Sequence, residues 1–301
     1  MLATLQVADG RPAGRPLQTL VVPMSKSIKL TLDLLIGAVA PVVILKYGTA
    51  PLGTLPAYLL AALVPVVWVL LDLLLITRRF NFISSYVGFS AIMRGALAFW
   101  YVSGALFAFK DSASYILAVV IFGGSAFLAR PVTRAIAYQG LGPDTPAREA
   151  ALGRLMDEPT VTSALRKAAL IIGATNLGAG VVNYWINYRM VLAPFNTPAF
   201  NDQVANVNAI TRVALALPDM LAVFWAFSMM YKAMYALLPA ENGPGADGGE
   251  FWELVRRRET EASARAAESA AQQEREAELA AQDASAQSRA NRKAREDFGL
   301  T

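Results

Sequence analysis

Long apolar segments dominate this chain and limit what it can fold into. A helix that crosses a bilayer needs about 20 mostly apolar residues. Six segments approach that length, at residues 28–45, 55–76, 87–109, 113–129, 168–192 and 207–238. With 55% hydrophobic residues and a mean hydropathy of +0.40, the chain is too apolar for an ordinary soluble protein. We therefore expect an all-α, polytopic transmembrane helical bundle of about six spans over residues 28–239.

The composition excludes several classes of function. The chain contains no cysteine and no histidine, which removes thiol and imidazole nucleophiles, Cys/His zinc sites and disulfides. We find no phosphate-binding loop, no serine-hydrolase motif and no acidic cluster with metal-ligand spacing. The net charge of +4 is spread over loops and tail, without a nucleic-acid-binding patch. The sequence thus predicts a non-enzymatic protein and assigns no catalytic, cofactor-binding or metal-binding residues.

Lysine and arginine in the connections predict the orientation, because short cytoplasmic loops are rich in these residues. On one side of the predicted membrane, the N-terminal segment and the connections hold Arg11, Arg15, Lys26, Arg78, Arg79, Arg130, Arg134, Arg148, Arg154, Arg166 and Lys167. The connections on the other side hold Lys46, Lys110 and Arg189. Both termini are therefore expected in the cytoplasm. Residues 1–27 form a cytoplasmic leader in this interpretation, and the first apolar segment is an uncleaved span.

The connection at residues 130–167 is expected to be a cytoplasmic amphipathic loop. Pro143 and Pro146 break the chain, and Thr145 is placed to cap a short helix over residues 147–156. The helix either lies on the inner leaflet or docks a partner.

Residues 240–301 differ abruptly from the rest. A Gly/Pro linker is followed by an alanine-rich, charged segment of high helix propensity. Alanine would fill the seam of any coiled coil, so we predict a solvated single helix that frays into disorder rather than a strong zipper. Phe251, Trp252 and Leu254 are expected to anchor its start at the membrane interface, with Arg256–Arg258 facing anionic headgroups.

Polar residues interrupt the last two apolar segments. Asn176, Asn183 and Asn187 fall on one helical face, and we expect this amide stripe to hydrogen-bond the last helix. Arg212 and Asp219 share a face of that helix, with Pro218 between them. The five side chains either join the helices or line a pocket or proton path.

A second group of charges is predicted near the cytoplasmic side, on three different helices. It consists of Asp33, Asp72 and Arg94. Ionisable groups in spans usually face the bundle interior, so Arg94 is expected to pair with one of the carboxylates. The alternative is that both aspartates sit near helix ends and Arg94 reaches the headgroups.

The stretches "LGAGVVNYWINYRMV" and "FNDQVANVNAITRVALALPDMLAVFW" resemble the closing part of the intracellular septation protein A family, small bacterial inner-membrane proteins. Asn183 matches the asparagine of the family's "GxxNxYV" helix, and Arg212 with Pro218 matches its lysine and proline. "FLARPVTRAIA" is similar to the family's basic-proline step, and "DEPTVTSALRKAALIIGATN" to the segment before its fifth span. The resemblance covers roughly residues 55–238. The family's Asn-x-Lys step is not reproduced, because Asn208 stands four residues before Arg212.

This resemblance implies a scaffold of the bacterial cytoplasmic membrane that supports envelope integrity or division. Its partners would be the lipid bilayer and other inner-membrane envelope or division proteins, with a homo-oligomer left open. It carries over no catalytic residue. The alternatives are a small proton-coupled transporter or channel that uses Arg94, Arg212 and Asp219, and a lipid-handling enzyme.

Overall fold

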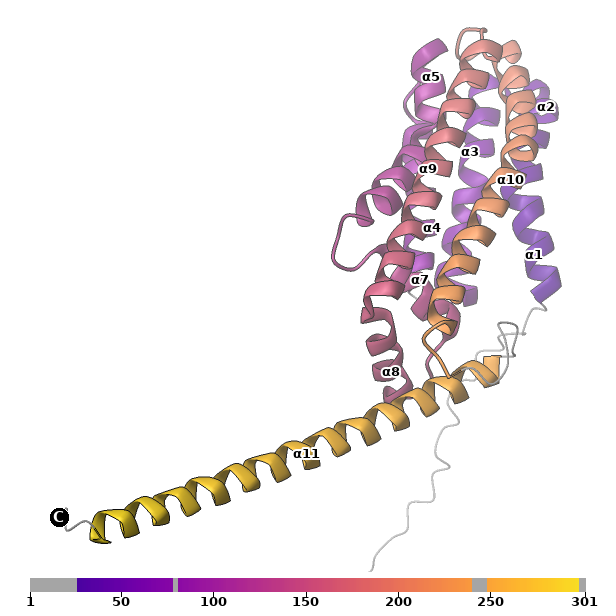
Figure 1. Cartoon of the computed structure of the whole chain (residues 1–301). Helices are drawn as coiled ribbons and strands as arrows, with labels where there is room; N and C mark the ends of the chain where they lie inside the picture. The colour runs from indigo at the N-terminus through magenta and orange to yellow at the C-terminus, as the bar shows by residue number, and fades with distance from the viewer. Residues whose placement is uncertain (1–25, 78–80, 240–247, 298–301) are drawn as a thin grey trace, which may run out of the picture. The chain divides into compact units, whose positions relative to one another are not determined.

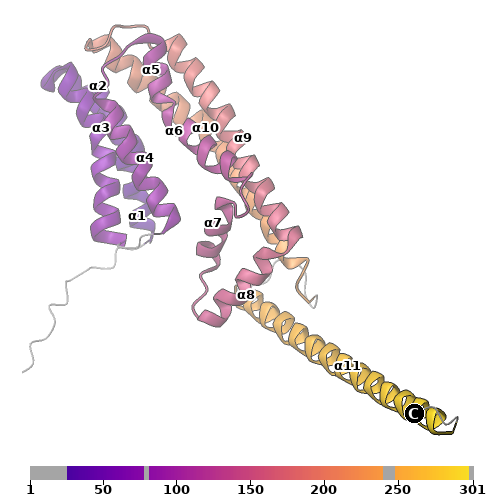
Figure 2. The ribbon, with the colours of Figure 1, turned by 90° about the vertical axis from the view of Figure 1, so that its left-hand side faces the viewer.

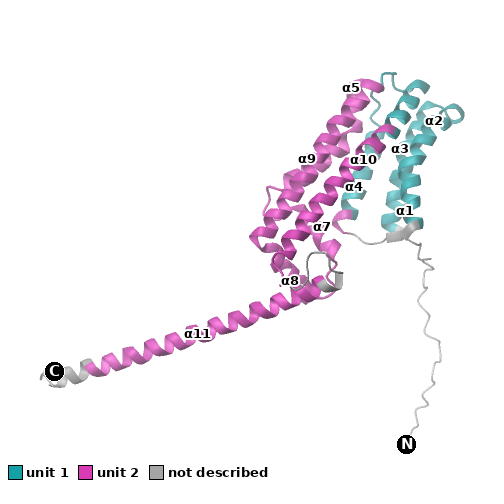
Figure 3. Ribbon diagram, turned by 45° about the vertical axis from the view of Figure 1, so that its right-hand side comes forward, with its two compact units in different colours: residues 1–80, 84–103, 191–209 teal, residues 81–83, 104–190, 210–301 magenta. Residues whose placement is uncertain are grey.

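The structure is a computed structural model that describes residues 26–77, 81–239 and 248–297. All regular elements in these ranges are helices (Figure 1), which confirms the predicted all-α class. Residues 1–25 of the predicted leader, and residues 240–247 at the predicted linker, lie outside the described residues. The chain divides into two compact units: residues 1–80, 84–103 and 191–209, and residues 81–83, 104–190 and 210–301 (Figure 3).

The first unit contains the N-terminal helices. α1 (Lys26–Leu34) continues through the π-helical turn η1 (Leu35–Val39) into α2 (Ala40–Leu52). A turn at Gly53, whose φ of 88° favours glycine, leads into α3 (Thr54–Leu71) and η2 (Asp72–Thr77). Most of α4 (Phe82–Ala98) belongs to this unit.

Aromatic packing joins α3 to the segment that precedes α10 (Pro198–Tyr235). The ring of Phe195 lies 5.3 Å from that of Tyr58, 5.3 Å from that of Phe200 and 5.1 Å from that of Tyr101, measured between centroids. The amide of Asn201 donates to the carbonyl oxygen of Thr54 at 2.8 Å. Segments far apart in sequence are thereby fixed together at this end of the unit.

The second unit is built along α9 (Pro159–Met190), the long helix that α5 (Gly104–Asp111), α6 (Ala113–Ala118) and η3 (Val119–Gly123) pack against (Figure 2). Glycines allow this close packing. A Cβ atom at Gly173 would lie 2.8 Å from the Cα atom of Gly123, and one at Gly180 would lie 2.9 Å from Cβ of Tyr115.

The remaining helices of this unit are α7 (Val132–Leu141), α8 (Pro146–Asp157) and α11 (Gly248–Asp297), together with most of α10. The predicted cap of α8 is confirmed, since Oγ1 of Thr145 accepts a hydrogen bond from the backbone N–H of Arg148. Gly142, with φ of 54°, ends α7.

Four helices of the described chain are long and apolar enough to cross a membrane: Thr31–Leu52, Thr54–Leu74, Pro159–Met190 and Pro198–Tyr235. The pair Gly104–Asp111 and Ala113–Gly123, bent by 43°, makes a fifth when counted as one span. The prediction of a continuous helix over residues 87–109 is wrong. α4 ends at Ala98, and α5 begins at Gly104 with a φ of 60°, a backbone conformation that stops a helix of L-residues.

Candidate functional site

The amide stripe of α9 contacts the break between α5 and α6. Nδ2 of Asn183 donates to Oδ2 of Asp111 at 3.0 Å and to Oγ of Ser112 at 3.1 Å. Nδ2 of Asn187 donates to the same carboxylate oxygen at 3.0 Å. Both asparagines are almost fully buried. The prediction that the stripe hydrogen-bonds the last helix is therefore wrong.

The helix break explains this arrangement physically. α5 ends at Asp111 and α6 begins at Ala113, and between them the backbone N–H and Oγ of Ser112 both donate to the carbonyl oxygen of Ala108 in the last turn of α5. The break turns Asp111 towards α9, where two amides satisfy a carboxylate that would otherwise be costly to bury. Asn176 is not part of this cluster, because its amide donates to the carbonyl oxygen of Ile172 in its own helix.

Lys110 belongs to the same break and is only 6% exposed. Its Nζ atom lies 5.5 Å from the ring centroid of Phe107, within the range of a cation–π contact. The sequence pattern placed Lys110 and Asp111 in an outer loop between two apolar segments and so gave no signal that they are part of a packed cluster.

Arg212 and Asp219 lie on α10, in the part that belongs to the second unit, and both are half-buried. Oδ1 of Asp219 is buried and, among the side chains that the structure describes, is the one buried oxygen or nitrogen without a hydrogen-bond partner. It lies on the same face of α10 as the buried residues Leu215 and Ala226. A carboxylate in such a position is the kind of group that functional sites in membranes retain.

In the first unit, Asp33 and Asp72 are brought together by a lysine. Nζ of Lys29 lies 3.0 Å from Oδ2 of Asp33 and 3.1 Å from Oδ2 of Asp72. The indole N–H of Trp68 donates to Oδ1 of Asp33 at 2.8 Å. The sequence predicted Arg94, on α4, as the cation for these carboxylates, and the cation that the structure places on both of them is Lys29. Its spacing of four residues from Asp33 was the available signal.

The start of α11 docks on α8 of the same unit. Three residues near this start, Phe251, Leu254 and Val255, are 2%, 4% and 3% exposed, and the ring of Phe251 packs edge-on against that of Tyr235. The prediction that Phe251 and Leu254 anchor in the membrane interface is therefore wrong, because both are buried within the protein. The tail, predicted as a solvated single helix that frays into disorder, is a single helix from Gly248 to Asp297.

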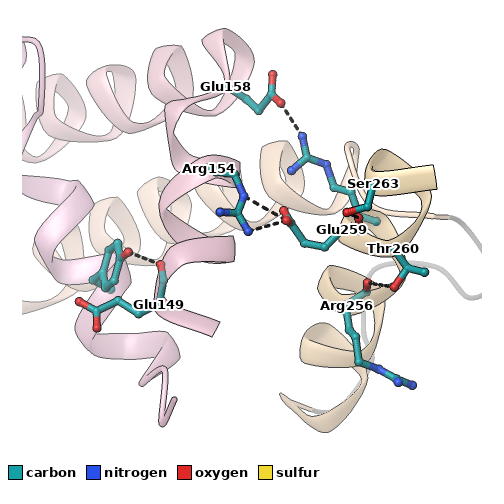
Figure 4. A network of polar contacts seen from close by, with 9 residues as sticks. Glu149, Arg154, Glu158, Arg256, Glu259, Thr260 and Ser263 are labelled. Carbon is teal, nitrogen blue, oxygen red and sulfur yellow. Dashed lines mark hydrogen bonds and ion pairs between the residues drawn. The ribbon is translucent and has the colours of Figure 1, made fainter. Parts of the chain in front are cut away.

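Ion pairs surround this contact, which we call the joint (Figure 4). Arg154 of α8 donates through Nε to Glu259 of α11 at 3.0 Å, and Arg258 pairs with Glu158. The guanidinium of Arg148 lies 5.2 Å from the ring centroid of Trp252. Basic residues that the sequence assigned to the inner leaflet thus bind α11.

A further tie fixes α8 to α7. The guanidinium of Arg134 pairs with Asp157 and also donates to the carbonyl oxygen of Gly153 at 3.2 Å, and its hydrogen bond lowers the pKa of the Asp157 carboxyl below the usual value. The hydroxyl of Tyr138 donates to the carbonyl oxygen of Glu149 at 2.6 Å. α8 is therefore held on one side by α7 and on the other by α11.

Beyond the joint, α11 continues as a solvated helix, which we call the arm (residues 260–297). Every side chain described in it, from Thr260 to Ala290, is exposed. The arm is continuous with the docked start of α11 in both views (Figures 1 and 2).

The fold and these clusters define the class: an all-helical protein with four or five apolar helices compatible with insertion in a membrane. Comparisons with protein-family models, with curated proteins and with solved structures gave no match.

Proposed function

We propose that this chain is a non-enzymatic scaffold of the bacterial inner membrane, which supports envelope integrity or division through contacts with other membrane proteins. In this proposal both termini are cytoplasmic and the chain crosses the membrane about six times. α4 is counted as the third span, although its 17 residues rise only about 26 Å against a hydrocarbon core of about 30 Å.

The arm carries this proposal. The joint fixes one end of a long charged helix to α8 through buried apolar residues and two ion pairs, and the described rest of that helix exposes its side chains. A helix held at one end and solvated along its length offers a contact surface rather than a reaction centre. The resemblance to septation protein A points to the same role.

The polar clusters within the apolar helices support this interpretation. Asp111, Asn183 and Asn187 satisfy one another between α5 and α9, and Lys29 satisfies two carboxylates between α1 and η2. Interhelical hydrogen bonds of this kind hold membrane bundles together.

Arm truncation tests the proposal. In a strain that lacks the gene, we would express the full chain, a chain that ends at Glu259, and the full chain with Asp219→Asn, and measure cell length and dye leakage. We expect the full chain and Asp219→Asn to restore both properties and the truncated chain to fail at equal membrane abundance. Full restoration by the truncated chain would overturn the scaffold role of the arm.

One observation favours a second candidate, a small proton-coupled transporter or channel. The buried, unpartnered carboxylate oxygen of Asp219 follows Pro218 within α10, and discontinuous or proline-containing spans often line transport sites. In proteoliposomes, a transporter would show proton flux that Asp219→Asn abolishes in a folded protein. A scaffold would show the same flux for both chains.

A further inference from the structure

The connection between η3 and α7, at residues 124–131, exposes large apolar side chains from a well-held backbone. Phe127 and Leu128 are 82% and 58% exposed, whereas Ser125 is only 4% exposed. The hydroxyl of Ser125 accepts a hydrogen bond from the backbone N–H of Val132 at 3.2 Å, which ties the connection to the start of α7. Two adjacent apolar side chains therefore point outward from a connection that hydrogen bonds hold in place.

Basic side chains flank this apolar pair. Nη2 of Arg166, on α9, donates to the carbonyl oxygen of Leu128 at 3.3 Å. Arg130 is exposed and follows Leu128 by two residues, at most about 7 Å of backbone. The carboxylate of Asp157, which lies within electrostatic range of Arg130, is paired with Arg134. Two guanidinium groups thus lie beside the exposed apolar side chains.

An exposed stripe on α9 indicates where this connection lies in a bilayer. Leu170, Leu177 and Val181 are exposed, and with Arg166 and Trp185 they recur at spacings of four and seven residues, on one helical face. Arg166 and Trp185 are about 28 Å apart along the helix, close to the hydrocarbon thickness of about 30 Å. Basic and tryptophan side chains are typical of the two membrane boundaries. Because Arg166 contacts the connection, the connection lies at headgroup level.

We propose that residues 124–131 and Arg166 form a binding site for an anionic phospholipid of the cytoplasmic leaflet. Phe127 and Leu128 insert among the acyl chains next to the headgroups, and the guanidinium groups of Arg130 and Arg166 bind the lipid phosphate. Arginine suits this role because its planar group donates parallel hydrogen bonds to phosphate oxygens. The inference rests on the membrane insertion that belongs to the proposed function.

The structure favours this connection over α8 as the contact with the leaflet. The sequence assigned that contact to α8, but Leu152 and Leu155 of α8 are fully buried, and its Arg154 binds Glu259. The connection instead combines exposed apolar side chains with basic ones. This composition is typical of segments that lie in an anionic membrane surface.

Lipid quenching tests the insertion in the full-length protein, which contains no natural cysteine. We would attach bimane to single cysteines at Phe127, Val181 and Ala150 in proteoliposomes and add phosphatidylcholine with brominated acyl chains, which quenches probes that contact the acyl chains. Val181, within the exposed stripe of α9, is the control for lipid contact, and Ala150, exposed on α8, is the control for water.

We expect quenching at Phe127→Cys and Val181→Cys but not at Ala150→Cys. Quenching at Val181→Cys alone would overturn the lipid site and leave membrane insertion intact. An absence of quenching at both positions would overturn the lipid site and the membrane insertion together.

Brominated phosphatidylglycerol at the same fraction tests the headgroup. A basic side chain near an anionic surface favours association about fivefold, so at low salt this lipid should quench the Phe127→Cys probe more strongly than brominated phosphatidylcholine does. Arg130→Gln should lower the local excess of anionic lipid about fivefold, whereas Arg275→Gln, which removes the same charge from the exposed arm, should retain it. Raising the salt concentration should weaken the preference in the chain with both arginines.

Equal quenching by the two lipids at low salt would overturn the site without any charge variant. A preference that Arg130→Gln leaves unchanged, with helicity preserved by circular dichroism, would also overturn it. Either result would leave the expected outcome of the arm truncation intact, so the two proposals fail separately.

Discussion

The contact between Gly173 of α9 and Gly123 of η3 allows a quantitative prediction. A methyl group added at Gly173 would lie 2.8 Å from Cα and 2.9 Å from the backbone N of Gly123. Both are backbone atoms, so no side chain can rotate to make room, and the helices must move apart. Gly178→Ala is the matched control on the same helix, because a Cβ atom there meets nothing within 4 Å.

Two terms set the magnitude. Inserting a methyl group into a packed interface costs about 1–3 kcal/mol, while replacing glycine by alanine within a helix gains about 0.5–1 kcal/mol. Gly178→Ala has only the favourable contribution of replacing glycine by alanine within a helix. Gly173→Ala receives both terms and should lose on the order of 1 kcal/mol of unfolding free energy. The difference between the two variants, about 1–3 kcal/mol, isolates the steric cost.

Unfolding in mixed micelles titrated with sodium dodecyl sulfate, followed by tryptophan fluorescence, measures this difference. We expect Gly173→Ala to unfold at a lower detergent fraction than the natural chain, and Gly178→Ala at an equal or higher fraction. Equal stability of the two variants would show that α9 and η3 do not approach through these glycines.

Three further predictions concern the polar cluster, the joint and the α7–α8 tie. Asp111→Ala removes one of the two acceptors of each buried amide, leaving Asn183 its bond to Ser112 and Asn187 its bond to the carbonyl oxygen of Asn183, and should cost about 1–3 kcal/mol in the same titration. Asn176→Ala, which loses only a bond within its own helix, should cost less than half as much. Phe251→Ala removes a buried ring, a change worth about 3–5 kcal/mol in a well-packed core, and should raise hydrogen exchange in the first turns of α11 but not in α9; unchanged exchange would contradict the docking of the joint. Arg134 lowers the pKa of Asp157, so the tie contributes fully above the unfolded aspartate value of about 3.9 and is lost as the pH falls through the lower folded value. Because the Asp157 side chain is 57% exposed, we expect less than about 1 kcal/mol, and Asp157→Asn should remove this part of the pH dependence of α8 hydrogen exchange.

The periodic and compositional signals predicted the helical class and much of the helix placement. The helices over Thr54–Leu74 and Pro159–Met190 contain most of two predicted segments, and the cap at Thr145 was visible as a threonine before a proline-started helix. Hydropathy could not locate the break between Ala98 and Gly104, because the residues on both sides are apolar and only backbone conformation changes there.

The polar clusters were harder to predict because they depend on which helices meet. Asn183 and Asn187 were recognised as one face, but their partner Asp111 lies far earlier in the sequence, at a break that looked like a loop. In the tail, the burial of Phe251 depends on the contact between α11 and α8. An aromatic residue beside arginines is equally typical of a membrane anchor, so the local sequence did not distinguish the two.

Because α11 is continuous across the joint, the joint fixes both the distance of each arm residue along the helix axis and the direction in which its side chain points around that axis. The helix separates Glu259 from Arg289 by about 45 Å, whereas a flexible chain of the same length would average about 30 Å and point in all directions. Inserting two residues beyond the joint would lengthen the arm by only about 3 Å but rotate everything after them by about 200°. Inserting seven would add about 10.5 Å and keep nearly the original direction. Changes in the length of this segment would therefore be tolerated in steps of seven residues rather than one.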